Sequence, residues 1–424
     1  MHSVSRRSKV LVVGTSADYI HWIRTRCPDR ALFLTCREIR ERALEPKPAV
    51  KEEILCDLTD YTQAEKTLQN HLEFWNFSLD AIACYDCESM ELAAFLAGRF
   101  SLNYPSIEAI NNCRNKYQTK HLWQEWGVPC PEGRMVHSPD EVIRFFNEVN
   151  VPCVLKPVSG SGSELIFCCE TENECRIAFD EIINGLKQRQ AHRLYRPFAG
   201  NNTPILIEEC IRGEEFSCDV MLENENIEVI RLSKKIRGTE AYFGTIKGYV
   251  LPASLPTGID LSSFHQNVIR GAKALGLSRA FCMLDFMVLG DKILFLEMAP
   301  RPGGDCLPFL LRRHNNIDTL TLNLDFAQKR SIILQEPNGA CPHIGLRLHA
   351  TEGGALKRID AMRLIGDPRI CEIHLPRMRG HVIRMPPEDY DSWILGHIIF
   401  EPYEGVDTES QCIEILDQVV VEVE

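Results

Sequence analysis

The sequence predicts a mixed α/β and α+β protein made of several units. Residues 9 to about 112 alternate short apolar runs with helical patterns, as parallel α/β sheets do. Residues 203–334 contain paired strand-like runs joined by tight turns, which is typical of antiparallel hairpins. After about residue 335, short strands are set among Pro and Gly, which indicates a separate α+β segment.

The composition is that of an ordinary globular protein. The 424 residues are enough for about two to four domains, and 45% apolar and 25% charged residues are usual proportions. A net charge of −12 argues against a general nucleic-acid or acidic-membrane binder. The 18 scattered cysteines are expected to be free thiols. Free thiols and the lack of an apolar signal region at the N-terminus together predict a cytoplasmic protein. No apolar run is long enough to span a bilayer, so no membrane contact is expected.

The first unit, residues 1–112, is predicted to be a Rossmann-like α/β domain. The run Lys9–Val13 ends at Gly14, and this lone glycine is not part of a G-x-G-x-x-G motif. A dinucleotide site is therefore weakly indicated, and a turn that packs on a neighbouring domain or substrate is preferred. Further strands are expected at 31–34 and 80–84, and helices at 61–74 and 88–100.

The stretch Ile293–Asp305 organises the rest of the chain. It begins as a strand and ends in a Pro-Gly-Gly loop, with Glu297 and Arg301 at the junction. Asp285 lies in the preceding strand-like run, and the Gly-Asp turn between the two runs predicts a hairpin. The two carboxylates would then lie side by side and repel unless a cation such as Mg²⁺ lies between them. The alternative is a solvated hairpin with ordinary surface charges.

Two lysines are candidates for phosphate contacts. Lys156 lies inside an apolar strand, where an ammonium is costly to bury alone, and the Ser/Gly loop 159–163 follows it. Because the lysine precedes the glycines, this is not a Walker A loop but suits a nucleotide flap. Lys116 lies near the beginning of an amphipathic helix that stops at Gly127. The alternatives are a plain flexible loop and a surface lysine.

Further polar segments could complete a cleft. Glu208 and Glu215 flank a short connection after a strand; such backbone can bond an adenine edge and a carboxylate can accept from ribose. The basic segment 231–248 suggests contact with phosphate or a carboxylate substrate, although a solvated basic loop is an equal alternative. Other residues that could reach the cleft, or serve the structure alone, are Arg347, His343 and His349.

Taken together, these motifs resemble the ATP-grasp superfamily, in the right order over residues 9–305. The resemblance implies an ATP-grasp fold with four parts: a pre-ATP-grasp domain at 1–112, a small lobe with the flap at 113–202, a large lobe with the metal site at 203–334, and a small C-terminal α+β domain at 335–424.

The resemblance also implies roles for individual residues. The implied catalytic residues are Arg301, Lys156 and Lys235. The implied ATP-binding residues are Lys116, Lys156, Ser161, Gly162, Ser163, Glu208, Glu209, Ile211 and Glu215. Asp285 and Glu297 would hold Mg²⁺, with Mn²⁺ as an alternative. Many members carry Asn where this chain has Ala299, which puts a full two-metal arrangement in doubt.

Within the superfamily, the segment 248–253, the Glu297–Asp305 motif and the extra C-terminal domain resemble the L-amino acid ligase branch. The implied reaction joins the carboxylate of one amino acid to the amine of another through an acyl phosphate. The expected partners are these small molecules, and a homodimer is the prior for such enzymes. Three alternatives stay open: a purine-pathway or carboxylase-type enzyme, a nucleotide-binding module without catalysis, and a Rossmann-type oxidoreductase.

Overall fold

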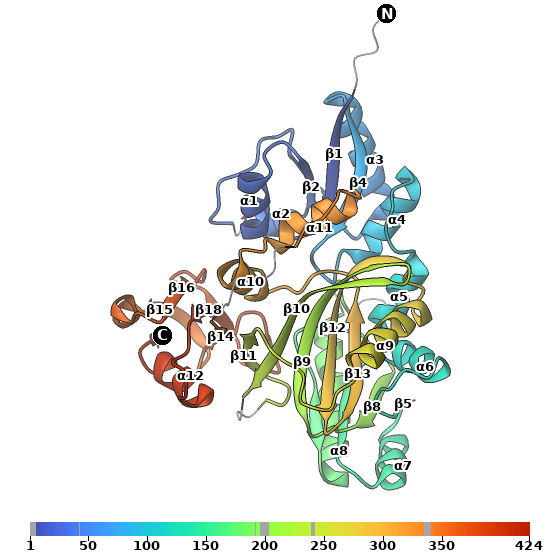
Figure 1. The fold of residues 1–424 in the computed structure, drawn as a ribbon, viewed down its shortest axis with the longest axis vertical. Coiled ribbons are helices and arrows are strands. Elements are labelled where there is room, and N and C mark those ends of the chain that lie inside the picture. The colour runs from blue at the N-terminus through green and yellow to red at the C-terminus, as the bar shows by residue number, and fades with distance from the viewer. Residues whose placement is uncertain (1–5, 42, 191, 196–202, 239–241, 335–340) are drawn as a thin grey trace, which may run out of the picture.

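The structure is a computed structural model that describes residues 6–41, 43–190, 192–195, 203–238, 242–334 and 341–424. Its strands form four sheets, and the chain runs from a parallel sheet through two antiparallel lobes to a smaller C-terminal part (Figure 1). The boundaries expected near residues 202 and 335 border segments outside the described residues. Among the described helices, none combines the length and apolarity needed to cross a membrane.

The N-terminal sheet is parallel, as the alternating pattern predicts, with the strand order β3-β2-β1-β4. Its strands are β1 (Arg7–Val13), β2 (Ala31–Thr35), β3 (Glu53–Leu55) and β4 (Phe77–Cys84). The associated helices are α1 (Ala17–Arg26), α2 (Arg37–Glu41), α3 (Tyr61–Phe74) and α4 (Met90–Phe100). The central strands are apolar on both faces because helices cover both faces of a parallel sheet.

Two helices from much later in the chain cover part of this unit. They are α10 (Leu307–Asn315) and α11 (Thr319–Ala327), and α11 is drawn in orange beside β1 and β4 (Figure 1). Trp22 of α1 packs edge-on against Phe309 and donates to Asp318 Oδ2 at 3.1 Å. The Tyr85 hydroxyl donates to the carbonyl of Leu320 at 2.7 Å. These contacts join the first unit to the two helices that follow the Pro-Gly-Gly loop.

The small lobe is an antiparallel sheet of order β5-β8-β6-β7. Its strands are β5 (Gly133–Val136), β6 (Cys153–Pro157), β7 (Phe167–Cys169) and β8 (Ile205–Glu209). Helices α7 (Pro139–Val149) and α8 (Glu172–Gln188) pack on it through a shared apolar core. Helices α5 (Ile107–Arg114) and α6 (Lys116–Glu125) lead into the lobe from the N-terminal sheet.

An eight-stranded sheet forms the centre of the molecule, in the order β13-β12-β9-β10-β11-β14-β18-β16. Five strands precede residue 300: β9 (Glu214–Glu223), β10 (Asn226–Arg237), β11 (Ile246–Leu251), β12 (Arg279–Leu289) and β13 (Lys292–Ala299). Three follow residue 340: β14 (His343–His349), β16 (Ile370–His374) and β18 (Ile394–Phe400). Helix α9 (Leu261–Ala274) covers one face through Phe264 and Val268. The later strands thus extend the sheet across the expected boundary at 335.

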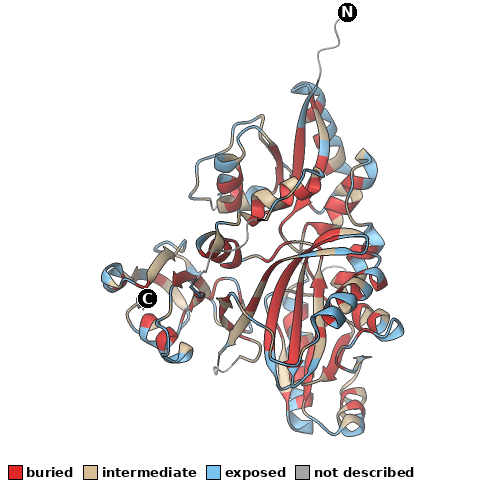
Figure 2. Cartoon of the chain, viewed as in Figure 1, coloured by how far each residue is buried: buried red, intermediate tan, exposed pale blue. Residues whose placement is uncertain are grey.

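The remaining C-terminal elements form a small layer beside this sheet (red in Figure 1). A three-stranded sheet has the order β17-β15-β19, and its strands are β15 (Gly354–Asp360), β17 (Val382–Ile383) and β19 (Val420–Val423). A 3₁₀ helix, η2 (Met362–Gly366), and helix α12 (Thr408–Leu416) complete it. Figure 2 shows the buried residues concentrated in the central strands and the exposed ones on outward helix faces.

A buried ion pair holds the Pro-Gly-Gly loop onto the central sheet. Arg231 on β10 lies opposite Asp219 on β9 and pairs with it at 2.9 Å, with both side chains at most 1% exposed. Asp219 also accepts from the backbone N–H of Gly303 at 3.0 Å. A Cβ on Gly303 would lie 2.5 Å from Arg231 Nη2, so only glycine allows this close approach.

We predict that Asp219→Ala lowers the free energy of unfolding by about 3–5 kcal/mol, because it leaves the Arg231 guanidinium buried without its partner. Urea denaturation measures the change. The control is Glu214→Ala, whose carboxylate pairs on the same two strands with Lys234 but at the surface, and whose loss should cost at most about 1 kcal/mol. Equal effects of the two substitutions would contradict this role for Asp219.

Candidate active site

One cavity of about 350 Å³ lies between the small lobe, the central sheet and the N-terminal unit. Every residue that the sequence singles out for catalysis, nucleotide binding or metal binding lines it: Lys116, Lys156, Ser161, Gly162, Ser163, Glu208, Glu209, Ile211, Glu215, Lys235, Asp285, Glu297 and Arg301. These residues come from segments almost 190 positions apart in the chain. Their individual roles remain predictions, whereas their convergence is a property of the fold.

Lys116 joins the flap to the carboxylates. It follows the N-cap Asn115 of α6, and its backbone N–H donates to the carbonyl of Val158 at 2.7 Å. Its ammonium donates to the carbonyl of Gly160 at 3.0 Å and lies 3.6 Å from Glu297 Oε2. The helix start therefore aims one cation at both the Ser/Gly loop and the end of β13.

Lys156 and Glu208 form a buried pair at the floor of the cavity, on the neighbouring strands β6 and β8. A second lysine, Lys120, lies beneath them, 3.8 Å from Glu208 Oε2, and donates to the carbonyl of Phe295 at 2.9 Å. Burial raises the pKa of Glu208, but the charges of Lys156 and Lys120 outweigh it and hold the pKa below its ordinary value. Lys120 is not among the residues predicted from the sequence, although its position one helical turn after Lys116 is a usable signal.

The connection after β8 is held by backbone bonds. The N–H of Glu209 donates to the carbonyl of Glu132 at 3.0 Å, and the N–H of Cys210 donates to the carbonyl of Pro152 at 2.8 Å. These bonds hold the segment from Glu209 to Ile211 against the cavity wall, where backbone groups can bond a flat polar ligand edge.

Lys235 connects two carboxylates on the cavity side of the sheet. Its ammonium donates to Glu215 Oε1 at 2.8 Å and to Asp285 Oδ2 at 2.7 Å. Burial would lower its pKa, but Asp285 and Glu215 reverse the shift and hold the pKa above its ordinary value. Glu215 also accepts from Arg237 Nε at 2.8 Å. Both carboxylate oxygens of Glu215, the residue predicted to bind ribose, are thus paired with basic side chains.

The predicted hairpin is confirmed: Asp285 on β12 lies directly opposite Glu297 on β13. Burial, with Glu297 as a repelling neighbour, raises the pKa of Asp285 despite the opposing charge of Lys235. Burial also acts to raise the pKa of Glu297, but Lys116 and Lys235 outweigh it and lower the pKa to about 2. The surrounding lysines therefore determine the pKa shift of Glu297, whereas burial determines that of Asp285.

The carboxylate pair fits a Mg²⁺ ion. Asp285 Oδ1 is buried and has no hydrogen-bond partner, so a lone pair is free toward the site. The Glu297 side chain is 41% exposed and lines the cavity. Mg²⁺ is commonly held by one or two carboxylates together with substrate phosphates. Ala299, which lies opposite Met283, contributes no side-chain oxygen, so the remaining ligands would have to come from elsewhere.

Arg301 and Arg347 line the part of the cavity that faces the N-terminal unit. Arg301 Nε approaches the Sγ of Cys87, in the segment after β4, at 3.1 Å. Arg347 pairs with Asp305 and donates to the hydroxyl of Tyr249 at 3.2 Å. The expectation that Arg347 could reach the cleft is confirmed. Two guanidinium groups thus face the end of the cavity beyond the carboxylate pair.

Other basic and histidine candidates lie elsewhere. In the segment 231–248, Lys235 and Arg237 line the cavity, whereas Arg231 is internal and Lys234 pairs at the surface. Alternate residues of a strand face opposite sides, and Asp219 neutralises Arg231. Only part of the basic segment therefore lies where a ligand could reach it, and its contact with a ligand stays a prediction. His343 and His349 are not among the residues that line the cavity.

Comparison with known proteins agrees with this site. Residues 149–308 match the ATP-grasp domain family. The chain is 26% identical over 207 residues to a D-alanine–D-alanine ligase from Acidovorax ebreus, which covers 47% of this chain and 57% of the ligase. It is 24% identical over 205 residues to the carbamoyl phosphate synthase large chain of Thermus thermophilus, covering 48% of this chain and 18% of the synthase. The chain thus spans well under two thirds of these curated relatives.

Solved structures match over nearly the whole chain. An L-amino acid ligase from Bacillus licheniformis gives a TM-score of 0.77 at 17% identity, covering 99% of each chain. An N5-carboxyaminoimidazole synthase from Aspergillus clavatus, in complex with ADP and a ribonucleotide, gives 0.70 at 14% identity and covers 98% of this chain and 100% of that one. The chain therefore carries an ATP-grasp domain and has the ATP-grasp fold, with a parallel N-terminal sheet and an antiparallel core.

We predict a specific pH dependence from Lys120. Burial lowers its pKa from 10.5 to about 8, against the attraction of Glu208. Between these two values the folded chain has lost the Lys120 proton while the unfolded chain keeps it, so stability rises with pH, by about 1.4 kcal/mol per unit at most. Lys120→Met lacks this contribution. In urea denaturation, the stability of the wild type relative to the variant should grow from about pH 8 to 10.5; a constant difference would contradict the shift.

Proposed function

We propose that the chain is an ATP- and Mg²⁺-dependent ligase that joins a carboxylate to an amine through an acyl phosphate, releasing ADP and phosphate. The observation that carries the proposal is that one cavity is lined by the two lysines proposed to contact phosphate, the flap, the carboxylate pair and two arginines. The match of residues 149–308 to the ATP-grasp domain family supports the nucleotide part. The D-alanine–D-alanine ligase among the relatives supports an amide-forming reaction.

The residues divide the work by position. Lys116 contacts the flap at Gly160, and Lys156 lies on the strand that leads into it. Both would neutralise phosphate charge, and preorganised cations contribute most to phosphoryl transfer. Asp285 and Glu297 would hold Mg²⁺, which when bound neutralises charge on the phosphate oxygens. Lys235, held by Glu215 and Asp285, is fixed in place and needs no reorientation during the reaction.

A carboxylate needs activation, because an amine that attacked it directly would have to expel oxide, which is a very poor leaving group. Transfer of a phosphoryl group to it gives an acyl phosphate whose leaving group is phosphate, and the amine then forms the amide. Arg301 and Arg347 line the cavity beyond the carboxylate pair and would bind the anionic acceptor. Ser161, Gly162 and Ser163 belong to a flap that would exclude the water that competes with the amine.

The substrates we propose are amino acids, so that the product is dipeptide-like. The likeness in fold to an L-amino acid ligase over 99% of both chains motivates this choice. A second candidate is a carboxylase-type reaction on a phosphorylated substrate, motivated by the fold-level likeness to N5-carboxyaminoimidazole synthase. The two differ in whether ADP release depends on an amino acid or on bicarbonate.

The direct test is ADP and phosphate release with Mg²⁺ against pools of amino acids and small carboxylates, followed by mass spectrometry. We expect release that requires both a carboxylate and an amine, and a product lighter by one water than their sum. With the carboxylate labelled by ¹⁸O, one labelled oxygen should appear in phosphate, because the acyl phosphate passes it on. Release driven by bicarbonate alone would favour the carboxylase candidate, and binding of ATP without turnover on any pool would contradict the ligase.

We further predict that Glu297→Gln lowers ATP turnover by at least about 10²-fold while the protein stays folded, because it removes a metal-facing charge without changing shape. Steady-state kinetics at several Mn²⁺ and Mg²⁺ concentrations, with circular dichroism, measures this. Glu214→Gln, on the sheet but outside the cavity lining, is the matched control and should keep wild-type turnover. Near-normal turnover of Glu297→Gln would contradict the metal assignment.

A further inference from the structure

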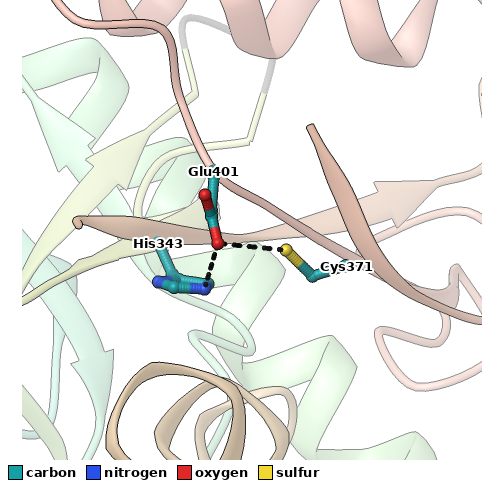
Figure 3. Close-up of side chains that lie close together, drawn as sticks. All are labelled: His343, Cys371 and Glu401. Atoms are coloured by element: carbon teal, nitrogen blue, oxygen red, sulfur yellow. Dashed lines mark hydrogen bonds and ion pairs between the residues drawn. The ribbon is translucent and has the colours of Figure 1, made fainter. Parts of the chain in front are cut away.

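A cluster of three different metal-ligating side chains lies outside the cavity, at one end of the central sheet. His343 precedes Ile344 on β14, Glu401 follows the end of β18, and Cys371 lies on β16 (Figure 3). One ligand atom from each lies within 4.8 Å of the others. This is the one group of three or more such side chains found among the described residues.

The strand register brings these residues together. Ile344 and Ile370 both lie opposite Phe400, on either side of β18. Their sequence neighbours His343, Cys371 and Glu401 therefore meet at the same end of three adjacent strands. On β16 the register shifts between Ile370 and Glu372, so Cys371 is the extra residue of a β-bulge. Bulges re-aim side chains, and this one turns Cys371 toward Glu401.

The histidine is oriented as metal-binding histidines usually are. His343 Nδ1 lies 3.0 Å from the carbonyl of Cys341. Because a carbonyl can only accept, this contact is made by the Nδ1–H, which leaves Nε2 as the ring nitrogen that can bind a metal ion. Nε2 lies 3.3 Å from Glu401 Oε1, which is an acceptor. Either a proton on Nε2 or a metal ion between the two atoms would satisfy this contact.

The distances are close to those of a tetrahedral zinc site, in which bonds of about 2.0–2.3 Å separate neighbouring ligand atoms by about 3.3–3.8 Å. The Nε2 to Oε1 distance is 3.3 Å, and Cys371 Sγ lies 4.0 Å from the same oxygen. A small movement of the thiol toward the other two ligand atoms would place all three at corners of a coordination tetrahedron. The Glu401 side chain is 51% exposed, so an ion can enter from solvent and keep water as its fourth ligand.

We propose that His343, Cys371 and Glu401 bind a Zn²⁺ ion. A thiolate, an imidazole and a carboxylate suit Zn²⁺ and do not suit Mg²⁺, which prefers oxygen ligands, so this site is chemically distinct from the carboxylate pair in the cavity. The bound ion ties together the start of β14, the bulge of β16 and the end of β18. Its displaced thiol proton passes to solvent.

This site is connected to the cavity through rigid elements. His343 and Arg347 lie on the same strand and the same face, four residues apart. The ring of His314, at the end of α10, packs edge-on against His343 at 5.6 Å, and its buried Nδ1 has no hydrogen-bond partner. Helix α10 begins two residues after Asp305, the partner of Arg347. Zinc binding would therefore hold the strand that carries Arg347, and through the His343–His314 ring contact it would also support the helix that follows Asp305.

The test uses the full chain, stripped of metal with a chelator and free of nucleotide and Mg²⁺. We expect Co²⁺ titration to saturate near one ion per chain with a thiolate-to-cobalt absorption band, and Zn²⁺ to displace it. Cys371→Ser should abolish the band, and Glu401→Gln should weaken Zn²⁺ binding at least about tenfold. The control is Cys341→Ser, an exposed cysteine beside the cluster that should leave the band and the affinity unchanged.

A second measurement needs no variant. Zn²⁺ should protect Cys371 from alkylation, read peptide by peptide in the mass spectrometer, while the exposed Cys341 stays reactive. Equal alkylation of Cys371 with and without Zn²⁺, or a cobalt spectrum without a thiolate band, would overturn the proposal and leave the cluster as a His–Glu ion pair. Neither readout involves ATP turnover, so the outcome is independent of the proposed ligase activity.

Discussion

The ion pairs made by Lys235 are the interaction on which the site depends. Glu215, Asp285 and Glu297 bring negative charge to one side of a buried cavity, and such groups repel each other strongly where water is excluded. The ammonium of Lys235 lies between Glu215 and Asp285 and bonds to both. It therefore lets these carboxylates remain close together while one oxygen of Asp285 stays available for a cation.

Strand alternation extends this arrangement along the sheet. Glu215, Ser217 and Asp219 lie two residues apart on β9, and Arg231, Ser233 and Lys235 lie two apart on β10. Each set therefore shares one face. The Arg231 end of this stripe binds the Gly303 loop, and the Lys235 end faces the cavity. One polar stripe thus holds both the Pro-Gly-Gly loop and the carboxylate pair in place.

The N-terminal unit is attached to the same loop from the other side. Helices α10 and α11 follow the loop directly and share an apolar core with α1, β1 and β4. Arg301 contacts Cys87 of the segment after β4. Ligands of open α/β sheets bind beyond the carboxyl ends of the strands, which is where this segment lies. The position of the proposed acceptor subsite therefore depends on contacts between parts of the chain more than two hundred residues apart.

Much of this could be predicted from local patterns. Apolar periodicity located three of the four parallel strands, all but β3, and the helix at 61–74. The Gly-Asp turn paired Asp285 with Glu297, because such signals act over a few neighbouring residues. The order of short motifs then indicated which side chains share a cavity.

Only the tertiary structure decided the remaining features. It placed Lys120 beneath Glu208, neutralised Arg231 with Asp219, and extended the central sheet with β14, β18 and β16. It also gathered His343, Cys371 and Glu401 at one end of that sheet. The physical reason is common to all of them. Each depends on the register and burial of segments distant in sequence, and a local pattern contains no information about which distant strand it will pair with.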